Sequence, residues 1–541
     1  MKTADNLLDR IEKLNALGIG LSAEKDYDRL LERILTGARE ITGADGGTLY
    51  IVGEERELRF EIVQTASLGL AMGGSTGKAV SFPPIPLYDG QGRPNVRTVA
   101  ARAALENRII NIPDVSSASE YDFSGTREFD ERTGYRSRSF LAVPMNDHEG
   151  RLIGVLQLIN AVSARGGAVV PFSEEDERLV ASLASQAALT LNRKRLIEEL
   201  QRLLDSLAQL IATAIDQKSA FTGGHCRRVP VVTMMLADAA DRCPTSPFTD
   251  VHFSEKERKA LEMAAWLHDC GKIATPEYLV DKRTKLEGIC DRLELIAARI
   301  EVMRRDARIA CLEQKVSALQ EGRREEIPFF EAELERRLEE LAGDFGFLQR
   351  CNQGREAMAE RALNRLAALS EVRIGWGGEK GSAPLLTQEE LRCLSIPQGT
   401  LTAEERGIIQ DHVRSTINML GTLPLPDHLK EVPMIAGGHH ERVDGKGYPL
   451  GLTAAQMPIQ ARILAIADVF EALTAADRPY RRANTLSEAL RVMDRMRTEG
   501  HLDSDLFELF IRERIYLRYA AEHLSPEQID EVDPALFIGS D

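Results

Sequence analysis

The sequence predicts a chain of three parts: an α+β domain, one long connecting helix and an all-α domain. Three observations support this division. The first 190 residues mix helical and β-rich runs, residues 196–214 carry leucines at coiled-coil spacing, and the remainder contains several apolar helical stretches. With 541 residues, the chain is long enough for several separate cores. We expect the parts to cover residues 1–190, 191–218 and 219–541.

The first part begins with a predicted helix at residues 27–41, where Leu30, Leu31, Ile34 and Leu35 recur at helical spacing. Glycines at 43–47 then turn the chain into a predicted strand. The predicted β-rich runs are residues 48–52, 57–64, 108–112, 139–144 and 151–159, the last two joined by a turn at 146–150. This order of elements predicts a mostly antiparallel sheet with helices.

The connecting part shows apolar residues at alternating spacings of four and three. They are Leu196, Leu200, Leu203, Leu207, Leu210 and Ala214. A helix lying on a domain surface would show a wider stripe, so this narrow seam favours a parallel coiled-coil dimer. We expect one continuous helix from about residue 173 to residue 218.

The third part contains a neighbouring imidazole and carboxylate, His268-Asp269, directly after an apolar helical stretch. A single buried His or Asp is more often a satisfied core group than a ligand. Here, however, five of the ten histidines and two aspartates form a candidate set: His225, His268, Asp269, His412, His439, His440 and Asp468.

Nitrogen and carboxylate ligands without cysteine pairs suit first-row ions such as iron, manganese, nickel or zinc. The set contains enough ligands for two octahedral metal centres, and Asp269 is the candidate for a carboxylate that bridges the two ions. We assign His225, His268, Asp269 and Asp468 to one ion, and Asp269, His412, His439 and His440 to the other. Two such ions activate a water and stabilise the leaving oxygen of an in-line displacement at phosphorus.

Two motifs resemble a known family. His268-Asp269 with Lys272, together with His439-His-Glu-Arg-Val-Asp-Gly-Lys-Gly-Tyr-Pro449, is similar to the HD-GYP subgroup of the HD phosphohydrolases. Thr222-Gly-Gly-His225 and Asp477-Arg-Pro-Tyr-Arg481 match the same pattern, so the resemblance covers about residues 200 to 520. It implies metal-dependent hydrolysis of the bacterial second messenger cyclic di-GMP to pGpG, GMP or both.

Three cationic side chains are candidates for contact with substrate phosphate. Lys272 lies four residues after His268 and is expected on the same helical face, although a solvated surface lysine is the alternative. Arg478 and Arg481 resemble the family's phosphate-contacting pair, and their guanidinium groups suit that contact. The alternative for both arginines is a solvent-facing helix start.

The Gly-Tyr-Pro motif predicts a loop that approaches a ligand closely. Gly445, Gly447 and Pro449 shape the loop, and Tyr448 supplies a rigid amphipathic wall. Without the neighbouring histidine pair, an ordinary turn would be the better interpretation.

Some relatives carry a carboxylate four residues before the first histidine, where it helps to hold a third ion. This chain has Phe221 at that position, and phenylalanine cannot bind a metal. We therefore expect two divalent ions per chain, preferably iron.

The order of elements in residues 1–190 resembles a GAF domain, a sensor fold for small molecules. Asn160 followed by Phe172-Ser-Glu-Glu-Asp-Glu177 is similar to the signature of cyclic-nucleotide-binding GAF domains. Ala161 replaces the lysine that pairs with the aspartate in that signature, so we expect Asp176 to lose its partner. We therefore prefer a structural role, with Phe172 in the core and Ser173 capping the next helix. The sensor's ligand is unknown.

Residues 286–397 form an insertion between the matching parts of the third domain. Two charged helical runs, about 288–320 and 328–369, predict a protruding hairpin. A solvated or dimer-facing appendage is the preferred interpretation, and docking of a partner is the alternative. Closing helices are expected at 486–497 and 503–521.

The composition limits the partners. A net charge of −16 argues against non-specific binding to nucleic acid or an anionic membrane, so metals, Lys272 and arginines must attract an anionic dinucleotide. Seven cysteines without a Cys-x-x-Cys pair indicate a reduced cytoplasmic protein, and Cys270 is expected to be an apolar filler. We see no signal peptide and no apolar run of about 18 residues.

Three classes of function remain. A cyclic di-GMP phosphodiesterase accounts for the metal set, Lys272, the loop and the arginines together. Another HD-type reaction, such as nucleotide phosphohydrolysis or di-iron oxygenation, needs only the metal set. A non-catalytic protein that binds cyclic di-GMP usually shows lost ligands, and none is lost here.

Overall fold

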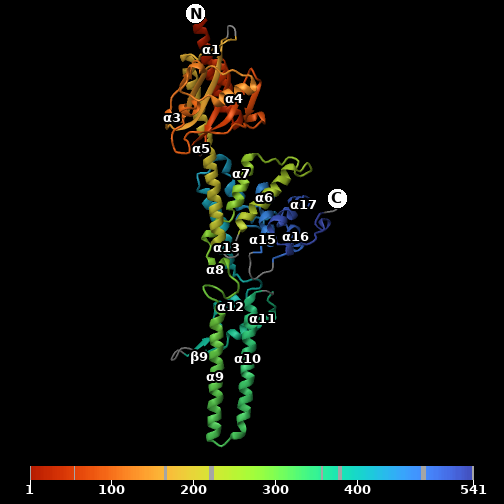
Figure 1. Cartoon of the computed structure of the whole chain (residues 1–541). Helices are drawn as coiled ribbons and strands as arrows, with labels where there is room; N and C mark the ends of the chain where they lie inside the picture. Colours follow the sequence, from red (N-terminus) through yellow and green to blue (C-terminus); the bar gives the residue numbers. More distant parts are fainter. Residues whose placement is uncertain are drawn as a thin grey trace. The chain divides into compact units, whose positions relative to one another are not determined.

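The computed structural model describes residues 2–53, 55–163, 167–218, 224–354, 357–375, 381–476 and 483–538, with side chains from residue 7 onward. The chain divides into two compact units, Met1–Leu203 and Leu204–Asp541 (Figure 1). Helix α5 (Glu174–Lys218) belongs to both units as one continuous helix, as the sequence predicted.

The first unit is an antiparallel sheet with helices. The strand order is β3-β2-β1-β7-β6-β5, with β4 beside β2 and β8 beside β7. The strands are β1 (Ala44–Val52), β2 (Glu57–Thr65), β3 (Leu70–Gly73), β4 (Ile85–Pro86), β5 (Ile110–Ile112), β6 (Phe140–Asn146), β7 (Leu152–Val162) and β8 (Val169–Val170). The helices that precede α5 are α1 (Lys2–Ala23), α2 (Tyr27–Thr42), α3 (Val99–Glu106) and α4 (Ser124–Thr133). The predicted α+β architecture is confirmed.

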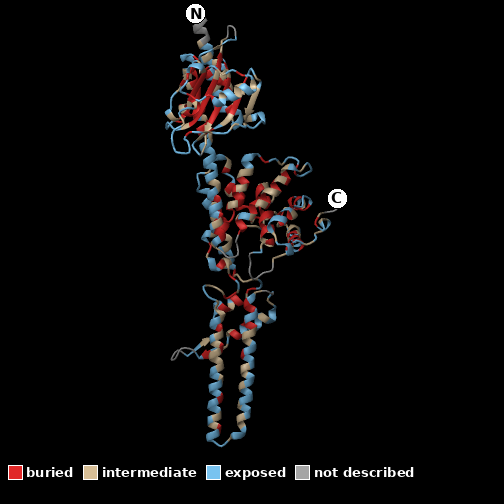
Figure 2. Cartoon of the chain, viewed as in Figure 1, coloured by how far each residue is buried: buried red, intermediate tan, exposed pale blue. Residues whose placement is uncertain are grey.

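Apolar side chains cover both faces of this sheet, and the strands are the most buried part of the unit (Figure 2). On one face, the predicted stripe Leu30, Leu31, Ile34 and Leu35 of α2 packs with the sheet and the first part of α5. On the other face, the alanines of α3 pack against β6 and β7. Helix α2 begins at the N-cap Asp26 and ends at Gly43, whose φ of 66° suits glycine.

The expectation that Asp176 lacks a partner is wrong. The Arg10 guanidinium of α1 donates a hydrogen bond to this carboxylate, replacing the lysine that Ala161 does not provide. The preferred structural interpretation is confirmed: Phe172 is buried, and the Ser173 hydroxyl accepts a hydrogen bond from the Asp176 backbone N–H. The partner was missed because it comes from a helix more than 160 residues away in the sequence.

The second unit is helical around a single large apolar cluster. Its elements outside the insertion are α6 (His225–Arg242), α7 (Glu255–Leu267), η3 (Cys270–Ala274), α8 (Glu277–Val280), α13 (Ala403–Gly421), η6 (Asp427–Leu429), α14 (Val432–Gly437), α15 (Ile459–Thr474), α16 (Leu486–Thr498), α17 (Ser504–Arg512), α18 (Ile515–His523), η7 (Pro526–Gln528) and η8 (Pro534–Leu536). The predicted closing helix at 503–521 is two helices, because Arg514 adopts a left-handed conformation with φ 48°.

The insertion has its own small core. It contains α9 (Leu293–Gln320), η4 (Arg324–Glu326), α10 (Ile327–Gln353), α11 (Glu360–Ser370), α12 (Gln388–Leu394) and the two-stranded sheet of β9 (Arg373–Gly375) and β10 (Ser382–Pro384). Helices α9 and α10 form the predicted hairpin (Figure 1). The second predicted run, 328–369, is wrong as a single helix, because Gly354 ends α10 with φ 64°.

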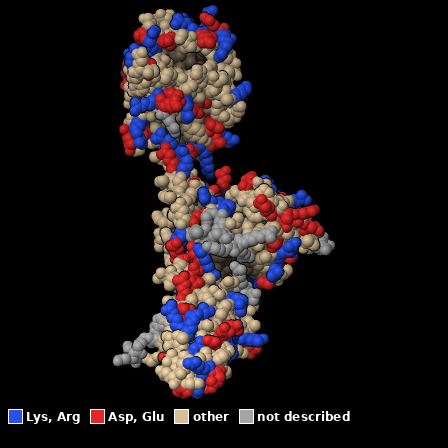
Figure 3. All heavy atoms as spheres, turned by 60° about the horizontal axis from the view of Figure 1, so that its bottom comes forward, with Lys and Arg blue, Asp and Glu red and all other residues tan. Residues whose placement is uncertain are grey.

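Acidic and basic side chains are interspersed on the face of the molecule that Figure 3 shows. Within the described ranges, none of the helices combines the length and the apolar character that crossing a membrane requires.

Candidate metal centre

The candidate ligands come from five helical segments of the second unit. His225 is the first residue of α6, and His268-Asp269 lies between α7 and η3. The other ligands are His412 in α13, His439 and His440 after α14, and Asp468 in α15. All of them except the partly exposed His440 are buried. Folding therefore collects residues that are up to 243 positions apart, from 225 to 468, at one place.

Asp269 stands between two groups of histidines. Its Oδ2 lies 3.3 Å from His268 Nε2 and 3.6 Å from His225 Nε2. Its Oδ1 faces the other way, 3.2 Å from His412 Nε2 and 3.9 Å from His439 Nε2. Ligands that share one ion at about 2.1 Å are separated by about 3 Å, so these spacings suit metal coordination.

The remaining two candidates complete the groups. Asp468 Oδ1 lies 3.2 Å from His225 Nε2 and 3.8 Å from His268 Nε2. His440 offers a ligand atom within 4.8 Å of those of His412 and His439. The geometry thus brings together every metal-ligand candidate that the sequence provided.

Three histidines point the same ring nitrogen into the centre. The Nδ1 of His268, His412 and His439 each meets the carbonyl oxygen three residues earlier, at 2.8, 2.6 and 2.5 Å. A carbonyl oxygen can only accept, so each Nδ1 carries the proton and each Nε2 presents a lone pair to the centre. This tautomer is the one that binds a metal through Nε2.

His225 is oriented by a carboxylate instead. Its Nδ1 donates a hydrogen bond to Oε2 of Glu471, a fully buried residue of α15. The other carboxylate oxygen accepts a 2.6 Å hydrogen bond from Arg228 Nε. Burial alone lowers the pKa of His225, but hydrogen bonds to Asp269, Asp468 and Glu471 more than offset it and raise that pKa. Three carboxylates surround this one imidazole, so the site has an excess of negative charge that bound cations would neutralise.

Unsatisfied atoms at the centre test whether cations fit. His412 Nε2, His439 Nε2 and Asp269 Oδ1 are buried and lack a hydrogen-bond partner. Each such atom costs about 1–3 kcal/mol. Two lone pairs and a carboxylate oxygen that face one another repel unless a positive charge lies between them. The residues therefore fit divalent cations.

Two histidines of the second group, His439 and His440, are neutral near pH 7, as metal ligation requires. Burial and the neighbouring His440 and His268 hold the pKa of His439 well below its usual value. Burial likewise lowers the pKa of His440 to about 4. No proton has to be displaced from these two imidazoles near neutrality.

Lys272 lies beside the central carboxylate. The sequence predicted one helical face for His268 and Lys272, but α7 ends at Leu267 and Lys272 belongs to the 3-10 helix η3. Its Nζ is 2.5 Å from Asp269 Oδ2, and its side chain is 24% exposed. Burial raises the pKa of Asp269, but Lys272 and His268 outweigh it and hold that pKa well below its usual value.

The last residue of α5 holds the segment that carries Lys272. The ammonium of Lys218 donates hydrogen bonds of 3.0, 2.6 and 2.7 Å to the carbonyl oxygens of Lys272, Ile273 and Thr275. These contacts occupy carbonyl groups at the end of η3, where helical hydrogen bonding stops. The long helix is therefore attached directly to the His-Asp segment.

The Gly-Tyr-Pro loop folds back onto the second histidine group. The Tyr448 ring lies 4.9 Å from the His440 ring, between centroids, and the Tyr448 N–H donates to the His440 carbonyl oxygen. The buried Glu441 carboxylate fixes the loop by accepting hydrogen bonds of 2.7 and 2.9 Å from the N–H groups of Leu450 and Leu452. Gly447 is required because a Cβ there would lie 2.3 Å from the Arg442 nitrogen.

Some predicted residues cannot be placed. Arg478 and Arg481, with the rest of 477–482, lie outside the described residues, and so does Phe221 with 222–223. Cys270 is buried, and burial raises the pKa of its thiol to about 11, which fits the expected apolar filler.

Sequence reasoning missed two buried carboxylates, Glu471 and Glu441. A signal was present for each. Glu471 follows Asp468 by three residues in an apolar helix and so shares its face, and Glu441 directly follows the histidine pair. A charged residue in such a position needs a partner.

Comparisons with known proteins match both units. Residues 26–191 match the GAF domain family, and residues 388–506 match the HD domain family. The chain contains a GAF domain and an HD domain. The HD match begins at residue 388, near the end of the insertion, so His268-Asp269 precedes the matched residues.

Three curated relatives are phosphodiesterases of cyclic dinucleotides. The 3'3'-cGAMP-specific phosphodiesterase 1 of Vibrio cholerae is 51% identical over 77 residues, which are 14% of this chain and 18% of that protein. A cyclic di-GMP phosphodiesterase of Pseudomonas aeruginosa is 37% identical over 140 residues, 25% of this chain and 32% of that protein. A cyclic di-GMP phosphodiesterase response regulator of Xanthomonas campestris is 35% identical over 148 residues, 25% and 38% respectively. The chain thus spans well under half the length of these relatives.

Replacing Glu471 by glutamine should weaken metal binding about 10- to 100-fold with little loss of ordered structure. The amide has one acceptor oxygen, so it cannot accept from His225 and Arg228 through two separate oxygens as the carboxylate does. Competition with a chelator measures the affinity, and circular dichroism checks the fold. Unchanged metal affinity would show that Glu471 does not orient His225.

Proposed function

We propose that this chain is a metal-dependent phosphodiesterase that hydrolyses cyclic di-GMP to pGpG, GMP or both, under the control of its GAF domain. The observation that carries the proposal is Asp269, whose two carboxylate oxygens face two separate groups of histidines. The names of the matched relatives support the substrate class. The GAF domain is proposed to bind a small molecule of unknown identity.

The proposed reaction adds one water to a phosphodiester bond. The water oxygen forms a new bond to phosphorus, the P–O3′ bond breaks, and a proton passes to the 3′ oxygen. Linear pGpG results from one such step and GMP from a second. Two bound cations would lower the pKa of a coordinated water and neutralise charge on the leaving oxygen.

The chain's own residues have distinct roles in this proposal. His225, His268, Asp269 and Asp468 hold one ion, and Asp269 with the remaining histidines holds the other. Lys272 is proposed to contact a phosphate oxygen, since its ammonium is partly exposed beside the centre. Arg478 and Arg481 are proposed as further phosphate contacts, and Gly445, Gly447, Tyr448 and Pro449 as the wall of the substrate site. This chemistry is assigned to the reducing cytoplasm, which suits seven cysteines without a pair motif.

An assay with several substrates tests the function. Purified protein is incubated separately with cyclic di-GMP, 3'3'-cGAMP and GTP, and the products are separated by chromatography. We expect linear products from cyclic di-GMP and intact GTP. Dephosphorylation of GTP with intact cyclic dinucleotides would assign the site to another HD-type reaction, and binding without products would make the chain a non-catalytic receptor. Faster turnover of 3'3'-cGAMP would change the preferred substrate.

We expect protein purified without oxygen to contain two metal ions per chain, preferably iron. Replacing His439 by alanine should remove about one of them, because this imidazole belongs to only one of the two groups. Elemental analysis with a protein determination gives the ratio. A stable ratio of three would contradict the argument from Phe221, and an unchanged ratio in the variant would remove His439 from the ligands.

We further propose that the seam on α5 joins two copies in parallel. The leucines of the seam are 44–63% exposed: Leu196, Leu200, Leu203, Leu207 and Leu210. They would be buried if this face of the helix packed against a domain of the same chain. Meanwhile Ala208, Ala212 and Ile215 on another face of α5 pack into the core of the second unit. Burial in a parallel coiled coil explains the exposed stripe.

Replacing Leu203 and Leu207 together by lysine should separate the copies, because two buried ammonium groups per helix cost several kcal/mol. Light scattering should report a monomer, with altered turnover and intact metal content. The paired control replaces Gln201 and Gln209, exposed residues off the seam, by lysine and should remain a dimer. A dimer that persists in the leucine variant would place the main interface elsewhere.

A further inference from the structure

Helix α9 of the insertion carries two apolar stripes. One stripe packs inside the hairpin and includes the buried residues Ile296, Ile300, Cys311 and Ala318. The other stripe is exposed and comprises Ile309 (53%), Leu312 (59%), Val316 (53%) and Leu319 (49%). A helix packed on one side alone needs only one such stripe.

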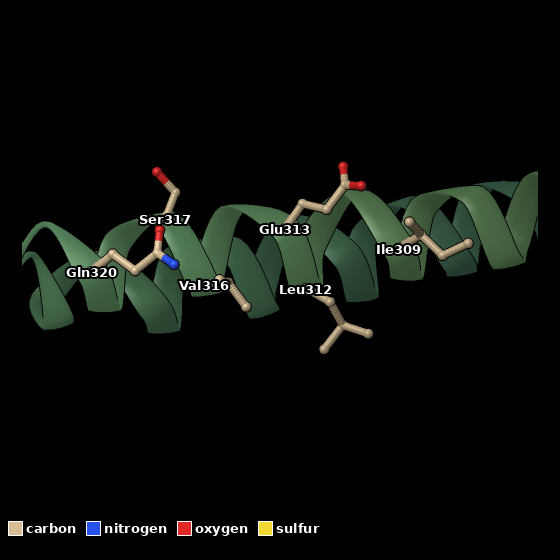
Figure 4. Close-up of a pocket in the computed structure, with 6 residues that line it drawn as sticks. All are labelled: Ile309, Leu312, Glu313, Val316, Ser317 and Gln320. Carbon is tan, nitrogen blue, oxygen red and sulfur yellow. The ribbon is translucent and has the colours of Figure 1, made fainter.

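The exposed stripe has the spacing of a coiled coil. Its four residues are separated by three, four and three positions, and Val302 and Leu295 continue one of the two rows toward the start of α9. In Figure 4, Leu312 and Val316 point to the same side of the helix, whereas Glu313 points to another side. Ile309, Leu312 and Val316 of the stripe line a shallow hollow together with Glu313, Ser317 and Gln320.

The charges beside the stripe are ordered. Arg308 and Lys315 flank one edge, where the Lys315 ammonium already lies 2.6 Å from Glu331 of α10, and Asp306 and Glu313 flank the other. In a parallel pair of α9 helices, each basic edge would face the acidic edge of the second copy, so that Arg308 lies opposite Glu313. In an antiparallel pair, like edges would meet and repel. The Arg308 side chain is half-exposed, and its ion pair with Glu301 is long, at 3.9 Å. The guanidinium can therefore turn toward a second copy.

We propose that α9 pairs in parallel with α9 of a second copy through this stripe. Helix α10 lies on the opposite side of each α9 and leaves the stripe accessible. The insertion is thus a second contact between the two copies that α5 joins, and its stripe of four residues is too short to hold the copies together once the α5 seam is lost. The inference does not depend on the proposed reaction.

Disulfide cross-linking of the full chain tests the pairing. Cys290, which is exposed, and Cys243 are first replaced by serine to remove background. Leu312→Cys then places one thiol at the stripe. In a parallel pair this thiol lies opposite the same thiol of the second copy. Ala310→Cys is the matched control, since residue 310 is exposed on the same turn but off the stripe.

We expect Leu312→Cys to give a covalent dimer under mild oxidation, and Ala310→Cys to give much less. A mixture of Leu312→Cys and Val316→Cys chains should form few mixed dimers, because those positions meet only in an antiparallel pair. Equal yields of covalent dimer from Leu312→Cys and Ala310→Cys would overturn the proposal. A preference for mixed dimers of Leu312→Cys and Val316→Cys would overturn it too, as would a different protein bound to the stripe.

Charge variants test the orientation independently. Glu313→Arg should slow cross-linking through Leu312→Cys about fivefold, because attraction at two symmetric pairs becomes repulsion. Adding Arg308→Glu should restore the rate by exchanging the edges. If the double variant is no faster than the single one, the parallel pairing is refuted even when both proteins are folded.

Discussion

Replacing Asp269 by alanine is expected to abolish hydrolysis of cyclic di-GMP, lowering turnover by at least about 100-fold, or about 2.7 kcal/mol of barrier. One carboxylate faces both histidine groups, so in the proposed two-ion centre its loss removes a ligand from each ion at once. It also leaves the Lys272 ammonium without its nearest anion. Metal content should fall together with activity, which initial rates and elemental analysis measure on the same preparation.

Asp411→Ala is the control for this variant. Asp411 precedes the proposed ligand His412 in α13, but its carboxylate is 73% exposed. We expect wild-type turnover and metal content there. A folded Asp269→Ala protein that keeps more than a few per cent of wild-type turnover would show that the carboxylate is not the bridge.

Gly271→Ala is expected to have the second-largest effect, although glycine 271 has no side chain to offer a ligand. An added Cβ would lie 2.0 Å from the His412 carbonyl oxygen and 2.6 Å from the Thr416 nitrogen. Both are backbone atoms of α13, so η3 itself has to move by about 1 Å. We expect a loss of about 1–3 kcal/mol in the free energy of unfolding and about 100-fold in turnover.

The Thr416 hydroxyl explains why this displacement reaches the metal centre. It accepts a 2.9 Å hydrogen bond from the Gly271 N–H and donates a 3.1 Å hydrogen bond to the His268 carbonyl oxygen. Gly407→Ala is the control, because a Cβ at this exposed position of α13 meets nothing within 4 Å. It should stabilise the helix by up to about 1 kcal/mol. Equal melting temperatures and rates for both variants would refute the steric argument.

The clustering of the candidate metal ligands could be predicted because several histidines and aspartates recur in apolar helical surroundings, where each buried polar group needs a partner. The first unit was predictable for a similar reason, since the α2 stripe and the alternation of β-rich runs reflect burial. These are local properties of the sequence.

What could not be predicted depends on tertiary contacts or on single backbone angles. Arg10 contacts Asp176 from another helix, and the spacing of apolar residues along the sequence does not indicate that pair. Gly354 and Arg514 each end a helix through one left-handed residue, whereas the apolar pattern continues past both. Lys272 meets Asp269 through a 3-10 turn instead of a shared helical face, which depends on the packing of η3 against α13.

Titration of metal-free protein with iron(II) tests the central claim most directly. Cyclic di-GMP hydrolysis is measured without oxygen while iron is added in fractions of one equivalent per chain. The two-ion centre predicts negligible activity without metal and a rate that rises until two equivalents are bound and then stays constant. Full activity in the metal-free protein, or a plateau at one equivalent, would contradict it.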